Sequence, residues 1–377
     1  MPTNYNPARS YPLVFFFHGG GGDENLFTNG APVGWPGYAN FTTTKVFASF
    51  RQQATDPAIV VWPTLRAGDG DWYTPYVQQA TNLLNSLIAQ FNIDTNRLYV
   101  GGLSAGGPPA WDLLGLRRGF FAAAMIMGTG PGSAVATLFK DVPFWVFDTF
   151  SDETGNVYQS RDMVRTLRLG GVNTIYTEYV TPGHIDGIGM SLCTPVTVDW
   201  LLAQRRGVAT TNQPVLSITS PTQQPVLPTG VTNLDLAGSA AALDRAVSQV
   251  AWTNYANNAK GVASGTNLWS ATNIPLVQSK TNGVVVVAVT TTSWAPAFGG
   301  STTFSDTLTV IQSPIQATLT LQGTEALLNW SGGGPPYRVQ RATDLAAGIW
   351  TDCLADATPP VHLSPTNQAG FYRIVGQ

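Results

Sequence analysis

Ser104 lies at the centre of the sequence Gly-Leu-Ser-Ala-Gly at residues 102–106. A serine in a Gly-x-Ser-x-Gly motif between a strand and a helix is typical of a nucleophile elbow, a tight turn that exposes the serine oxygen. Residues 97–100 have the composition of a strand and residues 109–114 that of a helix, so the motif has the required context. The alternative is an ordinary glycine-rich turn. We predict that Ser104 is a nucleophile for acyl transfer.

A second glycine-rich loop follows the apolar residues 11–17 and consists of His18 and four glycines. Acyl transfer needs two N–H donors at the carbonyl oxygen of the substrate. One donor is expected from Ala105, directly after the nucleophile, and the other from a His-Gly-Gly loop after an earlier strand. We assign the second donor to Gly20, with Gly21 as the next choice. A phosphate-binding loop is the alternative, but the Gly-Lys-Ser/Thr sequence is missing.

The general base should be a histidine in a loop after the last strand of the sheet. The chain has three histidines, His18, His184 and His362. His184 directly follows the strand-like residues 174–180, whereas His362 lies in a distal β-rich region and His18 is expected to shape its loop. We therefore predict that His184 is the base; the alternative is a loop histidine without a chemical role.

The carboxylate partner of the base should lie between the serine and the histidine in the sequence. Asp148, Asp152 and Glu153 are the candidates. Asp148 ends an apolar run, while Asp152 follows four residues later, in the loop. A carboxylate that serves a histidine on another loop must project beyond the edge of the sheet, which favours Asp152. Glu153 is a neighbour whose longer side chain could partly substitute.

These residues need a sheet to position them, and the first 210 residues supply its elements. Short, mostly apolar runs predict strands that are buried on both faces. They are separated by helical patterns, which predicts a mostly parallel sheet with helices on both faces. The predicted strands are residues 11–19, 56–63, 96–104, 120–128, 142–150 and 174–180, and the predicted helices are residues 76–91, 109–118, 160–171 and 193–207.

The amino-acid composition changes after a polar linker at residues 207–215. From there the chain is rich in Thr, Ser, Asn and Val and shows the alternation of half-buried strands. We predict three domains: a catalytic α/β domain at residues 1–210, a β-sandwich at 214–313 and a small β domain at 314–377. The fold class is therefore α/β with two C-terminal all-β sandwich modules.

The composition excludes several classes of function. The formal net charge is −3 and charged residues make up 11% of the chain, so nothing indicates a nucleic-acid partner. Two cysteines, Cys193 and Cys353, lie in different predicted domains and are expected to be free thiols. With three histidines they give no metal-ligand spacing. No apolar run is long enough to span a membrane, and the N-terminal residues lack the apolar core of a signal peptide. We expect no cofactor and no metal.

Residues 5–206 resemble the esterases of the α/β-hydrolase superfamily that include feruloyl and acetylxylan esterases and polyhydroxybutyrate-depolymerase-like proteins. Relatives in this group also carry the labels predicted peptidase and carboxylesterase. The resemblance implies that Ser104 is the nucleophile, Asp152 the acid and His184 the base. It rests on residues 11–24, 91–107, 119–128, 142–184 and 199–206 and on their order.

The chain departs from these relatives at two places. Asp148 and Thr149 stand where relatives usually have His-Gly, and the chain begins almost at the strand before the His-Gly-Gly loop, so we expect a missing start. Farther along, residues 214–313 are similar to bacterial Ig-like modules and residues 315–377 to fibronectin-III-like tails. These likenesses imply a secreted or cell-surface protein.

The resemblance implies a carboxylic-ester hydrolase that acts on feruloyl or acetyl esters of plant polysaccharides or on polyesters, including polyhydroxyalkanoate and aromatic polyester such as PET. Trp72 and Tyr73, in a loop after a predicted strand, are candidates for substrate binding; the alternative is packing under the loop. Trp111 is expected in the core. The β modules are expected to bind polymer or a cell surface, or to act as spacers. A serine peptidase with the same triad and a non-catalytic adhesion protein are the competing hypotheses.

Overall fold

The chain forms two compact units in a computed structural model, and we describe each unit by itself. Unit 1 consists of Met1–Ser217, Ala240–Gln249 and Val287–Asp306, and unit 2 of Ile218–Ser239, Val250–Val286 and Thr307–Gln377. The structure describes all residues except 21–49, 51–56, 67–68, 70–71, 73, 131–138, 155, 182, 185–186, 188–190, 192–194, 210–213, 222–224, 229, 243–245, 279, 291–300, 314, 324, 333–335, 365–369 and 376–377.

The centre of unit 1 is a parallel sheet with the strand order β6-β5-β4-β3-β1-β2. Its strands are β1 (Tyr11–Phe17), β2 (Ile59–Val61), β3 (Ile93–Leu103), β4 (Ala123–Met127), β5 (Phe144–Thr149) and β6 (Thr174–Tyr179). Because parallel strands end at the same edge, the segments that follow β1, β3, β5 and β6 meet there. The end of β1 pairs with the end of β3, Phe17 opposite Gly102.

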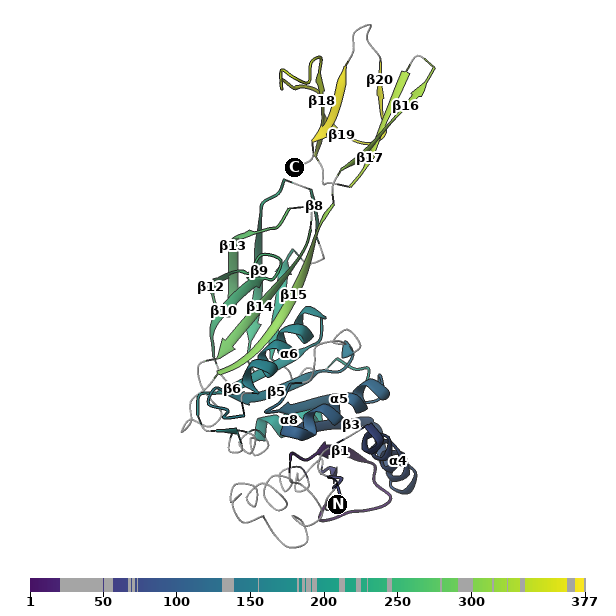
Figure 1. The fold of residues 1–377 in the computed structure, drawn as a ribbon, viewed down its shortest axis with the longest axis vertical. Helices are drawn as coiled ribbons and strands as arrows, with labels where there is room; N and C mark the ends of the chain where they lie inside the picture. Colours follow the sequence, from purple (N-terminus) through teal and green to yellow (C-terminus); the bar gives the residue numbers. More distant parts are fainter. Residues whose placement is uncertain are drawn as a thin grey trace. The chain divides into compact units, whose positions relative to one another are not determined.

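In the part of unit 1 that the structure describes, the helices that pack on this sheet include α4 (Thr74–Gln90), α5 (Gly107–Leu116), α6 (Val157–Leu169) and α8 (Pro195–Ala203) (Figure 1). Alternate strand residues such as Phe15, Val100 and Val146 form one core cluster with apolar side chains of α4, α5 and α6. On the other face, Trp145 of β5 meets Trp200 of α8 edge to face, with ring centroids 5.3 Å apart. Strands such as β1, β4 and β5 are thus buried on both faces, as their apolar composition requires.

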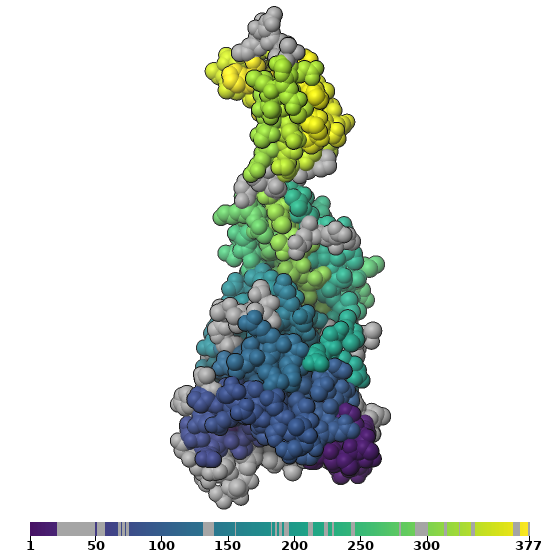
Figure 2. Space-filling view, turned by 90° about the vertical axis from the view of Figure 1, so that its right-hand side faces the viewer, coloured from purple at the N-terminus to yellow at the C-terminus, as the bar shows by residue number. Residues whose placement is uncertain are grey.

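Two further segments of unit 1 lie beside the sheet. The N-terminal residues lie at the surface (purple in Figure 2), where Asn92 donates a hydrogen bond to the Pro7 carbonyl oxygen over 3.3 Å. At the other edge of the sheet, the first residues of β15 (Ser301–Ser313) pair antiparallel with β6 through Ser301–Thr303. The guanidinium of Arg168, at the end of α6, donates to the carbonyl and hydroxyl oxygens of Thr303 over 3.1 and 2.9 Å.

The remaining strands are β7 (Val215–Ser220), β8 (Val226–Pro228), β9 (Asn233–Ala241), β10 (Val247–Asn254), β11 (Ala259–Val262), β12 (Ser264–Gly265), β13 (Leu268–Pro275), β14 (Thr281–Thr290), β16 (Gln316–Gln322), β17 (Glu325–Ser331), β18 (Tyr337–Ala342), β19 (Thr351–Ala357), β20 (Val361–Leu363) and β21 (Phe371–Val375). One four-stranded sheet has the order β12-β13-β9-β7. Two three-stranded sheets, β16-β17-β20 and β19-β18-β21, follow. The last two sheets enclose a small core around Trp330 and Val339.

The strands and helices predicted for residues 1–210 are confirmed, each within a few residues of its predicted ends. Pro108 and Pro109 occupy the first turn of α5, where the missing N–H groups are tolerated. The mostly parallel sheet with helices on both faces is consistent with the core of an α/β hydrolase, and further β sheets follow it. No helix within the described residues is long and apolar enough to cross a membrane.

Candidate active site

Ser104 occupies the turn between β3 and α5, where it begins the short 3-10 helix η1 (Ser104–Gly106). Its φ of 51° lies in the left-handed region that side chains other than glycine rarely adopt. A Cβ atom on Gly102 would overlap the backbone of Gly106, two residues beyond the serine. The glycines of the motif are therefore needed because the backbone folds tightly back on itself at Ser104.

The elbow lies against the end of β1, the strand that leads to Gly20. A Cβ atom on Gly106 would overlap the carbonyl oxygens of Phe17 and His18. This close approach sets the end of β1, at Phe17 and His18, against Gly106 of the elbow. Gly20 is exposed, and Gly21 lies outside the described residues.

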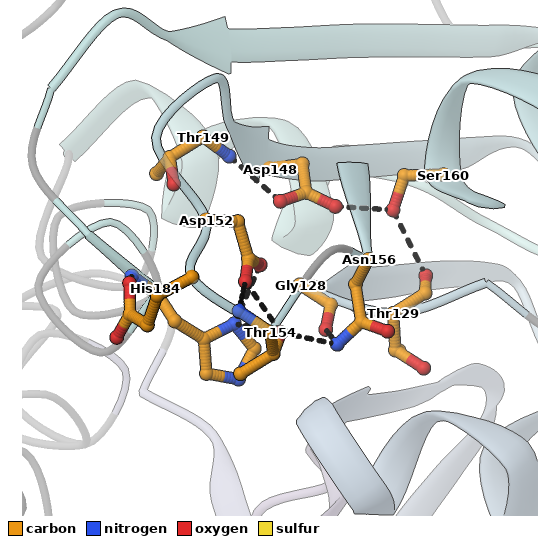
Figure 3. A network of polar contacts seen from close by, with 10 residues as sticks. Gly128, Thr129, Asp148, Thr149, Asp152, Thr154, Asn156, Ser160 and His184 are labelled. Atoms are coloured by element: carbon orange, nitrogen blue, oxygen red, sulfur yellow. Dashed lines mark hydrogen bonds and ion pairs between the residues drawn. The ribbon is translucent and has the colours of Figure 1, made fainter. Parts of the chain in front are cut away.

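His184 and Asp152 form a buried pair on the loops after β6 and β5. Nδ1 of His184 lies 2.7 Å from Oδ2 of Asp152 (Figure 3). The two residues are 4% and 8% exposed. Because Nδ1 contacts a carboxylate, it carries the ring proton and donates it to Asp152. The second ring nitrogen, Nε2, is then an acceptor.

The second nitrogen of His184 has no hydrogen-bond partner within the described part of the chain. Nε2 is nevertheless buried. A buried acceptor without a partner costs free energy, and such atoms often mark functional sites. The backbone N–H of His184 donates to Oε2 of Glu153 over 2.9 Å, so Glu153 holds the histidine loop and leaves the ring free for other chemistry.

Thr154 and Asn156 hold the carboxylate of Asp152 in place. Oδ1 of Asp152 accepts hydrogen bonds from the backbone N–H of Thr154, over 2.7 Å, and from its hydroxyl group. The Asn156 amide donates to Oγ1 of Thr154 over 2.7 Å and to the Gly128 carbonyl oxygen over 3.0 Å (Figure 3). Burial would raise the pKa of Asp152, but the hydrogen bonds from His184 and Thr154 outweigh burial and lower the pKa to about 2. Asp152 is therefore ionised at neutral pH.

Asp148, the other aspartate considered, lies at the end of β5 and contacts a different group. Its Oδ2 lies 2.5 Å from the hydroxyl oxygen of Ser160 on α6, and its Oδ1 accepts from the Thr149 N–H over 2.7 Å. The geometry thus pairs His184 with Asp152, whereas the hydrogen bonds of Asp148 include those with Ser160 and the Thr149 N–H.

His18 is buried and contacts backbone on both sides. Its Nδ1 lies 2.7 Å from the Gly19 carbonyl oxygen, and its Nε2 lies 3.4 Å from the Leu65 nitrogen. Both ring nitrogens are thus used in shaping the loop. The indole of Trp72 donates to the His18 carbonyl oxygen over 3.0 Å, and its ring packs edge to face on Phe17.

Trp72 also lines a cavity of about 520 Å³ beyond the end of β2, together with Arg66, Asp69, Tyr76 and Gln79. Tyr73, the other candidate for substrate binding, lies outside the described residues. Trp111 is in the core, as predicted, stacked on Phe144 with ring centroids 4.9 Å apart.

The sequence alone did not indicate a role for Thr154, Asn156 or Ser160. A signal existed for Thr154, because aspartate often bonds the backbone N–H two residues ahead in an Asx turn. Asn156 and Ser160 contact the residues that directly follow β4, Gly128 and Thr129, and no local sequence pattern predicts such tertiary contacts. Within the described residues, no group of three or more His, Cys, Asp or Glu side chains could hold a metal ion. Cys353 is an exposed free thiol, while Cys193 lies outside the described residues.

Several of the solved structures that are similar to this chain are esterases. A thermostable esterase is 28% identical with a TM-score of 0.45, and the match covers 54% of this chain and 58% of that esterase. A ferulic acid esterase is 15% identical with a TM-score of 0.40, over 52% of this chain and 87% of that one. A CE1 ferulic acid esterase from Anaeromyces mucronatus, solved with ferulic acid, is 14% identical with a TM-score of 0.37, over 50% and 79%. No protein-family model matches the sequence, and no curated protein matches it.

Proposed function

We propose that the chain is a carboxylic-ester hydrolase in which Ser104 is the nucleophile, His184 the general base and Asp152 the orienting carboxylate. The observation that carries this proposal is the buried contact of 2.7 Å between His184 and Asp152, with the other ring nitrogen unpartnered. Both loops end at the sheet edge where the strained turn holds Ser104. A base, its orienting acid and a serine hydroxyl at one edge are the parts that acyl transfer requires.

The mechanism follows from the protonation states. Nε2 of His184 takes the proton of the Ser104 hydroxyl as its oxygen attacks the ester carbonyl carbon. The Asp152 carboxylate stabilises the imidazolium that forms. The N–H groups of Ala105 and Gly20 are our candidates for binding the oxyanion of the tetrahedral intermediate. His184 then gives its proton to the leaving alcohol, and water activated by the same histidine releases the acid.

We propose that part of the substrate binds in the cavity lined by Trp72, which has both aromatic and polar residues in its lining. Trp72 and Tyr76 line the cavity beside the β1 loop, and Arg66, Asp69 and Gln79 supply its polar groups. We propose an ester with a ring in its acyl or alcohol part, such as a feruloyl ester, an acetylated sugar or a polyester unit. We also propose that the strands of unit 2 form Ig-like and fibronectin-III-like modules that bind polymer or a cell surface, in a secreted or surface-attached protein.

The test is a substrate panel for the full chain and its Ser104→Ala variant. We expect turnover of p-nitrophenyl acetate and of at least one ferulate ester, acetylated xylan, polyhydroxybutyrate or aromatic polyester film, all lost in the variant. Casein should remain intact. Casein cleavage without ester turnover would favour the serine peptidase, and equal turnover by the variant would exclude Ser104 and the proposed function.

A further inference from the structure

Asp148 lies in a buried cluster that the proposed mechanism does not use. It is 4% exposed, and Ser160, its partner on α6, is fully buried. The Ser160 hydroxyl oxygen lies within hydrogen-bond distance of two oxygens: Oδ2 of Asp148 at 2.5 Å and the Thr129 carbonyl oxygen at 3.1 Å (Figure 3). The cluster thus joins the end of β5, the first turn of α6 and the residues that follow β4.

Counting protons in this cluster shows which group must supply one. A serine hydroxyl has one proton, and a carbonyl oxygen has none. If Asp148 were ionised, both neighbours of the Ser160 oxygen would be acceptors, and one of the two contacts would lack a proton. If Asp148 is protonated, its carboxyl donates to Ser160, and Ser160 donates to the Thr129 carbonyl oxygen. Both contacts are then satisfied.

The charges around Asp148 favour the same state. Asp152 carries a negative charge four residues away. Glu178 lies opposite Asp148 on β6 and accepts from Tyr176 over 2.6 Å. The guanidinium of Arg161, on α6, donates to both oxygens of Glu178, over 2.8 and 2.6 Å, so its charge is already matched there. A third carboxylate at this place would meet like charges at close range.

We propose that Asp148 carries its proton at pH 6 and is a positioning residue, whose chain of hydrogen bonds through Ser160 to Thr129 fixes the acid loop relative to the nucleophile elbow. This inference rests on the proposed function. Thr129 makes the link to the elbow, because a Cβ atom on Gly107, the first residue of α5, would overlap the Thr129 side chain. Asn156 ties the Asp152 loop to Gly128, the adjacent residue.

The titration of Asp148 sets the pH range in which the cluster holds. Burial and the Asp152 charge raise the pKa of Asp148, while the hydrogen bonds that Ser160 and the Thr149 N–H donate to its ionised form lower it. The net result is a pKa of about 7. The unfolded chain loses this proton near pH 4. The folded chain keeps this proton up to about pH 7, so the free energy of unfolding falls as the pH rises from about 4 to about 7. Above pH 7 the whole of this loss of stability is present.

The test compares the full chain with its Asp148→Asn variant. The introduced amide donates to Ser160 and accepts from the Thr149 N–H, so it imitates the protonated carboxyl without titrating. We expect equal melting temperatures at pH 5 and a variant that is more stable by several degrees at pH 9. Asp162→Asn, at an exposed site of α6 where the carboxylate pairs with Arg165, is the matched control and should show no gain at pH 9.

Activity supplies the readout that a purely structural role would not move. We expect kcat/KM of the unmodified chain on p-nitrophenyl acetate, relative to Asp148→Asn, to fall by about fivefold between pH 6 and pH 9, because ionisation breaks one link of the chain. A ratio that stays constant over this range would contradict the positioning role. A melting-temperature difference that is independent of pH would contradict the buried proton.

Infrared spectroscopy of the unmodified chain gives a measurement that needs no variant to fold. A protonated-carboxyl band at pH 6 that disappears by pH 9 supports the proposal, and its absence at pH 6 contradicts it. The infrared and melting measurements do not depend on ester turnover. If both measurements show the buried proton while Ser104→Ala remains active, the proposed function is wrong and the protonated Asp148 is supported. If Ser104→Ala is inactive and neither measurement shows the proton, only the inference about Asp148 is wrong.

Discussion

At the scale of single residues, the site depends on a carboxylate that is both buried and ionised. Asp152 meets this condition because His184 and Thr154 supply hydrogen bonds that offset its burial. The Glu153 carboxylate accepts a hydrogen bond from the backbone N–H of His184, and the Asp148 carboxyl group contacts the Ser160 hydroxyl. Asp152 is therefore the residue whose charge can stabilise an imidazolium at His184.

Asp152→Asn should lower kcat by about 10⁴-fold near neutral pH, because the amide leaves His184 in the wrong tautomer without moving it. Glu153→Gln keeps an acceptor for the His184 N–H and should be mild. Steady-state kinetics of both variants, with melting temperatures to verify folding, provide the measurement. Nearly full activity in Asp152→Asn would show that another carboxylate serves the base.

The sequence indicated much of this site. The serine motif, the position of His184 and the choice of Asp152 followed from chain order and from the expected end of β5. The supporting residues could not be predicted, because Ser160, Asn156 and Thr129 meet through tertiary contacts between elements distant in sequence. The protonated state of Asp148 likewise depends on what packs around it, and no pattern of neighbours along the chain encodes that.

At the scale of elements, the elbow requires β3, α5 and the end of β1 to approach one another closely. Gly106→Ala places a methyl group against the carbonyl oxygens of Phe17 and His18, which are backbone atoms and cannot rotate away. We expect this variant to lose most of its ester turnover and several degrees of melting temperature. Circular dichroism melts and p-nitrophenyl acetate kinetics test it.

Gly115→Ala is the matched control, since it lies on the same helix, α5, and a Cβ atom there has open space around it. Alanine is the better helix former, so this variant should be as active as the original and more stable by about 0.5–1 kcal/mol. Similar behaviour of the two variants would mean that the close approach at Gly106 is not required.

The elements themselves were predictable because apolar runs of five to seven residues between helical patterns have few other solutions in a two-layered or three-layered domain. The pairing of β15 with β6 was not predictable. Residues 301–303 lie more than a hundred positions from β6, and their Ser and Thr side chains do not identify the neighbouring strand. The polar linker at residues 207–215 instead predicted that the catalytic domain ends there.

At the scale of the whole molecule, unit 1 is not continuous in sequence, because its β6 edge is covered by the start of β15. A chain that ends at Ala209 would expose the edge of β6 and would remove Thr303, a partner of the buried Arg168 guanidinium. We expect it to retain turnover of small soluble esters, but to melt several degrees lower and to self-associate.

A chain that ends at Ser313 keeps β15 and serves as the control. Scanning calorimetry and analytical ultracentrifugation of the two truncated chains and the full chain decide the matter. If the chain that ends at Ala209 melts with the other two and stays monomeric, the pairing of β15 with β6 contributes nothing to unit 1. If activity on insoluble polymer falls in both truncated chains while small esters are unaffected, the modules beyond β15 bind polymer.

The most direct test of the account is to identify the nucleophile by covalent trapping. A fluorophosphonate reacts with a serine that a histidine has activated and stays attached, and mass spectrometry of a digest locates the adduct. We predict one adduct, on Ser104, formed rapidly by the full chain, slowly by Asp152→Asn and not at all by Ser104→Ala. An adduct on another residue, or unchanged ester turnover by a chain whose Ser104 is fully labelled, would contradict the account.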